Sequence, residues 1–302
     1  MRVFVTGATG FIGSAVVAEL ISAGHQVLGF ARSDAGARSL TAAGASVHRG
    51  SLEDLESLRS GAASADGVIH TAFIHDFNNY APAAETDKRA IETLGAALAG
   101  SGRPLVVTSG TLLVERQGAA ATEEDAPSPN SLRKSEEAAR AIASRGVRLG
   151  VLRLPPSVHG ASDRGFVPFL IKIAREKGVS AYIGDGLNRW PAVHRLDTAR
   201  LYRLVLEKGS AGGTYHGIAD EGIPARDIAQ VISRRLNVPL VSKSREEAAG
   251  HFGWMARFFG VDCPASSVRT QRELGWLPTQ PRLIADIEEH YFESEPAAHA
   301  AR

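Results

Sequence analysis

Three glycines near the start of the chain have the spacing of a phosphate-binding turn. The stretch TGATGFIG places Gly7, Gly10 and Gly13 after an apolar run, where a strand would end and a helix begin. Gly7 permits a tight turn, Gly10 lets the backbone approach a pyrophosphate, and Gly13 lets the helix pack against the strand. Backbone N–H groups at a helix start also attract anions. The residues expected to hold a dinucleotide here are Gly7, Thr9, Gly10, Phe11, Ile12 and Gly13; the alternative is a glycine turn without a ligand.

The end of the next strand pattern carries a basic residue where a carboxylate would select NAD(H). An acidic side chain at this place binds the ribose hydroxyls, whereas a basic one suits the 2′-phosphate of NADP(H). The stretch GFARSD offers Arg32 and Ser33, with Asp34 slightly beyond, and a guanidinium pairs bidentately with phosphate. The sequence favours NADP(H), bound by Arg32 and Ser33. The weaker alternative is NAD(H), held by Asp34 while Arg32 lies on a surface turn.

Alternating strand and helix patterns must position these residues. The strand patterns are RVFVTG, HQVLGFA, ASVHRG, DGVIHTAF, RPLVVTSG and VRLGVLRLP, with helical stretches near 52–60, 85–100 and 132–145. Apolar strands separated by helices indicate a parallel sheet that is covered on both faces. The predicted fold class is α/β, a doubly wound Rossmann sheet with a smaller, mostly helical C-terminal part.

The alternation fades after about residue 155, which suggests how the chain is divided. We expect residues 1–155 to form the dinucleotide-binding domain, with returns from about 192–220. Residues 156–191 and 221–292 would form the substrate-binding part. The small, polar stretch 293–302 is expected to be a disordered tail.

Composition excludes several other classes of protein. Among 302 residues, 34 are Lys or Arg and 33 are Asp or Glu, so there is no concentrated basic surface for nucleic acid. No apolar run approaches the roughly 20 residues that span a bilayer, and the N-terminus enters a strand directly without a secretory signal. The single cysteine, Cys263, cannot form an internal disulfide. We expect a cytoplasmic protein with no membrane or nucleic-acid partner and no bound metal.

With these motifs in place, the chain resembles the extended and atypical short-chain dehydrogenase/reductases of the NAD-dependent epimerase/dehydratase type. TGATGFIG is similar to that family's glycine motif, and the similarity extends over nearly the whole length. GSLEDLESL resembles the segment that holds the adenine, which implies roles for Ser51 and Leu52. VIHTAF resembles the fourth strand, whose end lines the coenzyme. By this resemblance the coenzyme contacts there are Thr71, Ala72 and Phe73.

Two later strands complete the resemblance. VVTSGT resembles the fifth strand, which carries a catalytic serine or threonine, and so implies coenzyme contact at Thr108. LRLPPSVHG resembles the sixth strand, whose end meets the nicotinamide and implies contacts from Pro155 and Val158.

The family's catalytic Tyr-x-x-x-Lys pair is absent from the helix expected after the fifth strand. In the family the tyrosine exchanges a proton with the substrate, and the lysine lowers the tyrosine pKa and binds the ribose. In NSLRKSEEAAR, the better register puts Leu132 in the tyrosine place and Glu136 in the lysine place. The other register puts Asn130 and Lys134 there. The resemblance therefore implies fold and coenzyme more strongly than mechanism.

Three sites offer replacement groups near the expected nicotinamide. Ser109 and Thr111 flank Gly110 in the place of the family's catalytic hydroxyl; the alternative is a structural turn. His75 and Asp76 follow the fourth strand and could supply a proton donor and its neighbour, or simply form a solvated loop. His159 follows the sixth strand, where a structural role is the stronger alternative.

The substrate segment departs from the sugar-nucleotide pattern. In GDGLNRWPAVH, Trp190 stands where the family usually carries an arginine, and Arg189 comes one place earlier. On a strand, a shift of one residue turns the side chain to the other face. Phe166 and Trp190 are the aromatic residues expected to contact substrate, together with Asp76 and His159, unless the aromatic residues belong to the core.

These observations predict an NADP(H)-dependent reductase of an apolar or aromatic carbonyl or imine. The alternatives are a nucleotide-sugar epimerase or dehydratase, and a non-catalytic NADP(H)-binding sensor. The resemblance also implies a homodimer through the helices near 85–100 and 132–145.

Overall fold

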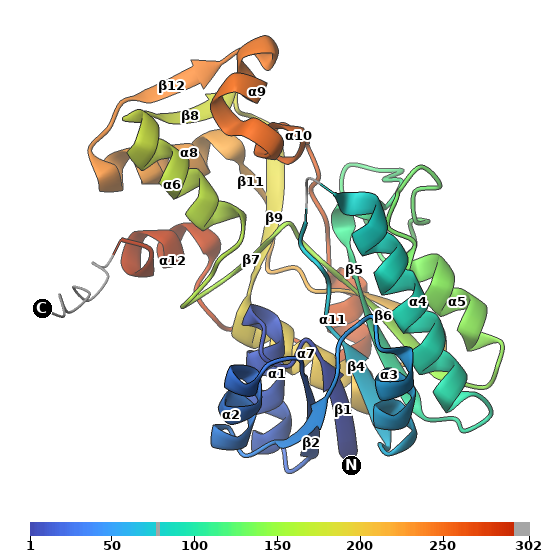
Figure 1. Ribbon diagram of the computed structural model, residues 1–302. Helices are drawn as coiled ribbons and strands as arrows, with labels where there is room; N and C mark the ends of the chain where they lie inside the picture. The colour runs from blue at the N-terminus through green and yellow to red at the C-terminus, as the bar shows by residue number, and fades with distance from the viewer. Residues whose placement is uncertain (77–78, 293–302) are drawn as a thin grey trace, which may run out of the picture.

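The main body is a seven-stranded parallel sheet in the order β10-β6-β5-β4-β1-β2-β3, seen in the computed structural model (Figure 1). The structure describes residues 1–76 and 79–292. The strands are β1 (Arg2–Thr6), β2 (Gln26–Ala31), β3 (Ser46–Arg49), β4 (Gly67–His70), β5 (Pro104–Gly110), β6 (Arg148–Leu154) and β10 (Gly213–His216). Their apolar side chains are buried on both faces, as expected for parallel strands covered by helices.

Two groups of helices cover the sheet. One face packs on α1 (Phe11–Ser22), α2 (Asp34–Ala42) and α7 (Arg195–Lys208). The other face packs on α3 (Leu55–Ala63), α4 (Tyr80–Leu98) and α5 (Ser135–Ala143). Each face has its own apolar core, so the predicted doubly wound α/β fold is confirmed.

The strand order reverses between β1 and β4. The chain moves outward from β1 through β2 to β3, then crosses to β4 on the other side of β1 and continues through β5 and β6. In open α/β sheets, ligands bind outside the carboxyl ends of the strands at such a reversal. The turn that follows β1 and the segment that follows β4 are therefore brought together at the expected binding edge.

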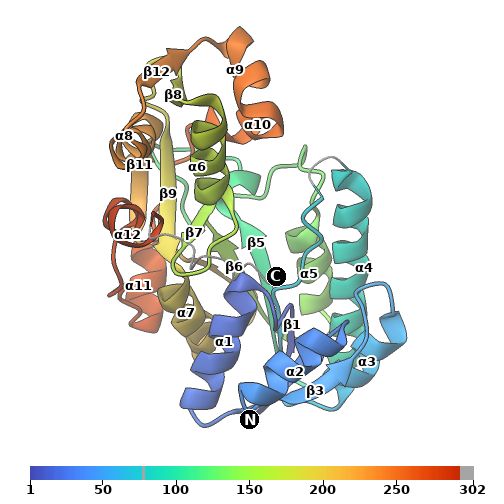
Figure 2. The same ribbon diagram turned by 60° about the vertical axis from the view of Figure 1, so that its left-hand side comes forward.

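A smaller C-terminal part stands beyond this edge (Figures 1 and 2). It has a three-stranded sheet of β7 (Ser157–His159), β9 (Arg189–His194) and β11 (Asp220–Pro224), and a parallel pair, β8 (Ser180–Ile183) and β12 (Leu240–Lys243). Its helices are α6 (Phe166–Lys177), α8 (Ala225–Leu236), α9 (Arg245–Phe252), α10 (Ala256–Phe259) and α12 (Leu283–His290). A separate aromatic-rich core holds these elements together.

Two details depart from the sequence-based expectation. The helix expected over 132–145 begins only at Ser135, so residues 128–134 form an irregular segment above the sheet. The helix α11 (Val268–Leu274) and the following Trp276 lie in the core beneath α7 rather than in the substrate part. Trp276 donates to the Asp197 carbonyl at 3.0 Å, which ties this late segment to α7.

The predicted tail, 293–302, lies outside the described residues. Of the helices in the described part of the chain, none has the length and apolar character needed to cross a membrane.

Candidate active site

The glycine turn has the close packing that its spacing predicts. Gly7 has φ +67°, a conformation that suits glycine, and the Gly10 N–H donates to the Gly7 carbonyl at 2.8 Å. A Cβ added at Gly13 would lie 2.0 Å from the Gly7 carbonyl oxygen. Because Gly10 caps α1 without a side chain, the first N–H groups of that helix lie open at the turn. These residues fit a dinucleotide pyrophosphate.

The segment after β4 forms the other wall of this turn. A Cβ at Gly7 would lie 2.6 Å from Thr71 Oγ1 and 2.7 Å from the Ala72 nitrogen. The Thr71 hydroxyl donates to the Thr6 carbonyl at 2.7 Å, which fixes the segment as it leaves the sheet. The structure thus brings together the glycine turn and the predicted coenzyme contacts Thr71, Ala72 and Phe73.

The end of β2 exposes the predicted cation. Arg32 and Ser33 are exposed, and Ser33 caps α2 by accepting from the Gly36 N–H at 3.2 Å. Asp34 is paired with Arg49 at the end of β3, with 2.6 Å between Oδ1 and Nη2. Arg32 therefore stands beside a carboxylate that already has a cationic partner.

The residues predicted to contact the adenine follow the neighbouring edge strand. Ser51 and Leu52 come two and three residues after the end of β3, and both are partly buried. Leu52 packs against the core beneath α3 and α4. This places them on the same carboxyl edge as Arg32, farther from β1.

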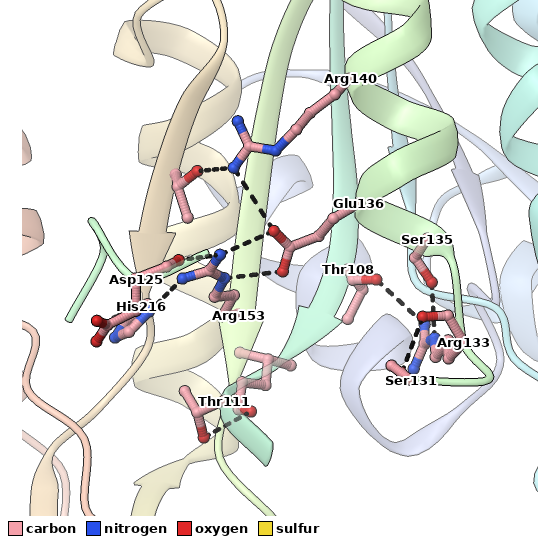
Figure 3. A network of polar contacts seen from close by, with 12 residues as sticks. Thr108, Thr111, Asp125, Ser131, Arg133, Ser135, Glu136, Arg140, Arg153 and His216 are labelled. Atoms are coloured by element: carbon pink, nitrogen blue, oxygen red, sulfur yellow. Dashed lines mark hydrogen bonds and ion pairs between the residues drawn. The ribbon is translucent and has the colours of Figure 1, made fainter. Parts of the chain in front are cut away.

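The hydroxyls in β5 and directly after it have contacts within the protein. Thr108 Oγ1 lies 2.6 Å from both the His70 carbonyl and the Tyr202 hydroxyl. Ser109 is buried and hydrogen-bonds the Glu136 carboxylate. Thr111, also buried, is 3.5 Å from the Leu154 carbonyl (Figure 3). These contacts hold the hydroxyls in structural hydrogen bonds, and catalytic roles for Ser109 and Thr111 stay predictions.

A buried ion pair occupies the place of the family's lysine. Glu136 accepts from Arg153 on β6 at 2.8 and 2.9 Å, and both side chains are almost wholly buried (Figure 3). Arg153 also donates to the Asp125 carbonyl at 2.9 Å and approaches His216 Nε2 at 3.4 Å. Burial acts to raise the pKa of Glu136, but hydrogen bonds and charge from Arg153 outweigh it and lower that pKa. The carboxylate is therefore ionised and committed to Arg153.

A second guanidinium, from Arg133, lies beside β5 at the carboxyl edge of the sheet and belongs to neither register of the family's motif. Its Nη2 donates to the Thr108 carbonyl at 3.1 Å, and its Nε donates to Ser135 Oγ at 2.7 Å. Its Cζ lies 4.1 Å from the centre of the Phe73 ring. The signal that could have found it is a cation beside the empty tyrosine place, in LRKSE.

A chain of buried polar groups supports Arg133 from below. Asp87 on α4 lies 3.4 Å from Arg133 Nε and hydrogen-bonds Ser135. Its other oxygen is 3.2 Å from His70 Nε2, and His70 Nδ1 is 2.8 Å from Thr6 Oγ1. Burial acts to raise the pKa of Asp87, but Arg133, His70 and Ser135 together lower it. An ionised Asp87 thus holds the base of the arginine.

Comparison with known proteins now decides the family. A profile of the NAD-dependent epimerase/dehydratase family matches residues 3–218. The chain belongs to this family. An uncharacterized protein of Schizosaccharomyces pombe is 52% identical over 95% of this chain and 98% of its own. The 2-alkyl-3-oxoalkanoate reductase of Stenotrophomonas maltophilia is 29% identical over 81% of this chain and 78% of its own.

A solved structure agrees in fold. The dTDP-glucose 4,6-dehydratase of Streptomyces venezuelae, with NAD bound, superposes with a TM-score of 0.77 at 22% identity, covering 96% of each chain. The extended short-chain dehydrogenase/reductase resemblance is confirmed, and the chain is an epimerase/dehydratase-family oxidoreductase.

Neither register of the family's catalytic pair puts suitable groups at the site. Leu132 is 64% exposed. In the other register Asn130 is exposed, and Lys134 Nζ donates to the Pro129 carbonyl at 2.9 Å. In this epimerase/dehydratase-family chain, Arg133 is the cation that contacts both the end of β5 and Phe73.

The loop after β4 brings an imidazole near this arginine. His75 and Asp76 are exposed, and the His75 ring lies 5.3 Å from the Phe73 ring. The pKa of His75 is lowered, first by loss of solvent around the ring and next by the Arg133 guanidinium. A neutral His75 is a weak proton donor at neutral pH, so its catalytic role stays a prediction.

The predicted substrate contacts that follow β6 differ in how deeply they are buried. Trp190 is fully buried in the core of the C-terminal part, which corrects its assignment as a substrate contact. The substrate-contact assignment of His159 is corrected in the same way: it is also fully buried, with Nδ1 2.6 Å from Asp286 Oδ2. The reason is that both project from the three-stranded sheet toward packed helices. Phe166 is only partly buried, so it stays a predicted substrate contact.

Of the predicted nicotinamide contacts on this segment, Pro155 is buried and Val158 partly buried against the core beneath α7. Arg189 lies on β9, one residue before the place where the family usually carries its arginine. Arg189 forms a pair of hydrogen bonds at 3.0 Å with Asp262, and these lower the pKa of Asp262 to about 2.

Proposed function

We propose that this chain is an NADP(H)-dependent reductase of an apolar or aromatic carbonyl or imine compound. The observation that carries the proposal is the glycine cradle at the β1/β4 reversal, together with the exposed Arg32 at the end of β2. A guanidinium at that place can pair with a 2′-phosphate. The pairing of Asp34 with Arg49 supports NADP(H) over NAD(H), because the carboxylate that would hold a free ribose is already engaged.

A second cation supports binding of the pyrophosphate. The Cζ of Arg195, at the start of α7, lies 5.0 Å from the centre of the Phe11 ring, and Phe11 opens α1. Arg195 Nη1 donates to the Ala161 carbonyl at 2.9 Å, which holds the side chain across the cradle. The positive end of α1 and the guanidinium would act together on the pyrophosphate charge.

An aromatic cluster supports an apolar substrate. Phe166 and Phe169 on α6 pack with Trp254 and Phe258, with ring centres 4.9 to 6.0 Å apart. All four are only partly buried, and Leu112, which directly follows the catalytic edge of β5, packs against the same core. Such a wall suits an acyl or aryl group better than a charged sugar.

The relatives favour a reductase acting on a carbonyl compound. The name of the Stenotrophomonas maltophilia enzyme describes reduction of a 3-oxoalkanoate with an alkyl branch. The alternative, a nucleotide-sugar epimerase or dehydratase, is favoured by the solved neighbour. The missing Tyr-x-x-x-Lys pair and the commitment of Arg189 to Asp262 count against that alternative.

The bound coenzyme would supply a hydride to an electrophilic carbon. The protein's part is to hold the substrate between the β5 edge and the aromatic cluster and to stabilise the negative charge that develops on its oxygen. An imine would need less assistance, because its nitrogen can be protonated before reduction.

A homodimer through α4 and α5 stays a prediction from the resemblance. The exposed positions of α4 include Glu85, Arg89 and Glu92, so the contact would be polar. Light scattering would test it.

The test is consumption of NADPH, followed by absorbance, with ethyl benzoylacetate, acetophenone and a cyclic imine. Turnover with at least one compound, and preference for NADPH over NADH, is the expected result. In R32A the preference should fall by about tenfold or more, since one charged hydrogen-bond pair contributes about 1.5–3 kcal/mol. R59A, which removes an exposed arginine on α3, is the matched control and should keep the preference. NADP(H) binding without turnover of any compound would instead indicate a sensor.

A further inference from the structure

We propose that Arg133 is the catalytic electrophile of this site: its guanidinium Nη1 donates hydrogen bonds to the substrate oxygen, in the role left vacant by the absent tyrosine and lysine. This inference rests on the proposed reductase function. It assigns the chemistry to a residue that lies outside both registers of the family's motif.

The fold leaves one donor nitrogen of Arg133 available. Arg133 uses Nε on Ser135 and Asp87, and Nη2 on the Thr108 carbonyl. Within residues 1–76 and 79–292, Nη1 makes no hydrogen bond or ion pair. The side chain is 13% exposed, so the guanidinium is shielded but reachable.

Arg133 lies where the edge of β5 extends beyond β4. The register of the sheet pairs His70, the last residue of β4, with Val107 on β5. Beyond this pair β5 continues along β6 while β4 has ended, and here the Thr108 carbonyl accepts from Arg133. The guanidinium therefore fills the space between the β5 edge and Phe73, directly beside the β1/β4 reversal.

Buried partners hold Arg133 rigidly in place. Asp87 is 1% exposed and is held by Ser135 and by His70, which in turn contacts Thr6 on β1. The base of the guanidinium is thus tied to α4, α5 and the centre of the sheet. A donor that is already oriented needs little reorganisation when charge develops on the substrate oxygen, which is the condition for efficient electrostatic stabilisation.

The competing groups are less suited to this role. The Ser109 hydroxyl is bonded to the Glu136 carboxylate, and Thr111 is directed at the Leu154 carbonyl. A guanidinium offers N–H donors and a positive charge. It can therefore bind a developing alkoxide but does not act as the proton source.

The proposed step is hydride transfer to the carbonyl carbon, followed by protonation of its oxygen by water. The carbonyl carbon receives one hydrogen and two electrons as the hydride that the reduced nicotinamide supplies, and the carbon–oxygen π pair moves onto oxygen. Arg133 Nη1 hydrogen-bonds that oxygen as it becomes negative. The oxygen then takes a proton from water, giving the alcohol and hydroxide, which the buffer neutralises.

The experiment compares R133K and R133A with the wild type, using the carbonyl compound that is reduced fastest in the panel above. We expect kcat to fall by about 10²–10³-fold in R133A, the size seen when one oxyanion donor is removed. NADP⁺ affinity, measured by calorimetry, should change little. Affinity of the NADP⁺-saturated protein for the same carbonyl compound, a readout that needs no turnover, should also fall. Guanidinium ion at low, non-denaturing concentration should restore part of the activity of R133A, and methylammonium should restore less.

R103A is the matched control. Arg103 donates to the carbonyls of Ala62, Ala63, Ala65 and Ala97 at the opposite end of β5, so it is an arginine with a similar anchoring role far from the site. Guanidinium should not raise kcat in that variant. Thermal unfolding of each variant shows whether it is folded, and R133K covers the case in which R133A is not.

The outcomes separate the two proposals. Wild-type turnover with kcat of R133K and R133A within about threefold of the wild type would overturn the role of Arg133 and leave the reductase assignment standing. A wild-type protein that binds NADP⁺ but reduces nothing would overturn both. Equal rescue of R103A and R133A by guanidinium would show that Arg133 acts only on the fold.

Discussion

Two arginines contact the first turn of α5, Arg153 through Glu136 and Arg133 through Ser135, and the fold uses them differently. Arg153 is wholly buried and is surrounded by Glu136, two backbone carbonyls and His216 (Figure 3). Arg133 is anchored along one side by Asp87, Ser135 and the Thr108 carbonyl, and its Nη1 has no hydrogen-bond partner among the described residues. The protein saturates the first guanidinium, whereas the second keeps a donor that we propose for the substrate oxygen.

This difference shows how the chain departs from its family's chemistry without losing its fold. In the place of the family's lysine, Glu136 takes a structural partner in Arg153 and ties α5 to β6. The neighbouring cluster keeps an oriented cation at the ends of β4 and β5. We therefore assign Arg153 a structural role, and our proposal assigns the remaining donor of Arg133 to the substrate oxygen.

The largest expected effect is the loss of stability when Arg153 is removed. R153M leaves the buried Glu136 carboxylate without its bidentate partner, and breaking a buried pair in this way costs about 3–5 kcal/mol. Urea unfolding at neutral pH measures the change. A loss below about 1 kcal/mol would mean that the pair does not hold the two elements together.

The next effect is a dependence of stability on pH that comes from the same cluster. Burial is the main cause that lowers the pKa of His216 from 6.5 to about 4, and the positive charge of Arg153 also acts to lower it. Between pH 6.5 and about 4, His216 binds a proton in the unfolded chain but not in the folded chain. The free energy of unfolding should therefore fall as the pH is lowered through this range.

Unfolding titrations across that window check this expectation. H216Q should flatten the dependence, and H290Q, at a half-exposed histidine on α12, should leave it in place. If H216Q and the wild type have the same slope, His216 is not held neutral by its surroundings.

A smaller effect is expected at the outer edge of the Arg153 cluster. Arg140 lies 3.6 Å from Glu136, and its side chain is 47% exposed. R140A should cost about 0.2–1 kcal/mol, as for ion pairs in contact with solvent. Urea unfolding of R140A and R153M under the same conditions compares the two losses of unfolding free energy directly. Equal losses would show that burial does not distinguish the two arginines.

The smallest effect is expected from restoring the family's aromatic residue. L132Y changes a position that is 64% exposed, so the new hydroxyl would point to solvent rather than to the site. We expect kcat within about twofold of the wild type, since a proton donor must lie within hydrogen-bond reach to contribute. A rise of tenfold or more in steady-state assays would show that the tyrosine place still faces the substrate.

The sequence predicted those parts of the site that depend on local spacing. The glycine turn, the parallel sheet and the cation after β2 follow from residues that are neighbours in the chain. Arg133 did not follow, because its partners Asp87 and Thr108 lie 46 and 25 residues away and meet it only after α4 and α5 pack on the sheet. Trp190 was misjudged because an aromatic residue on a strand can face a core or a ligand, and only helix packing decides which.

Binding of the coenzyme itself is the most direct test of the dinucleotide site at the glycine turn and Arg32. Calorimetric titration of the wild-type protein with NADPH and with NADH, in the same buffer, measures what the glycine turn and Arg32 recognise. We predict that both coenzymes bind and that NADPH binds at least about tenfold more tightly, which corresponds to about 1.4 kcal/mol. Failure of both coenzymes to bind at millimolar concentration would contradict the assignment of this edge of the sheet as a dinucleotide site.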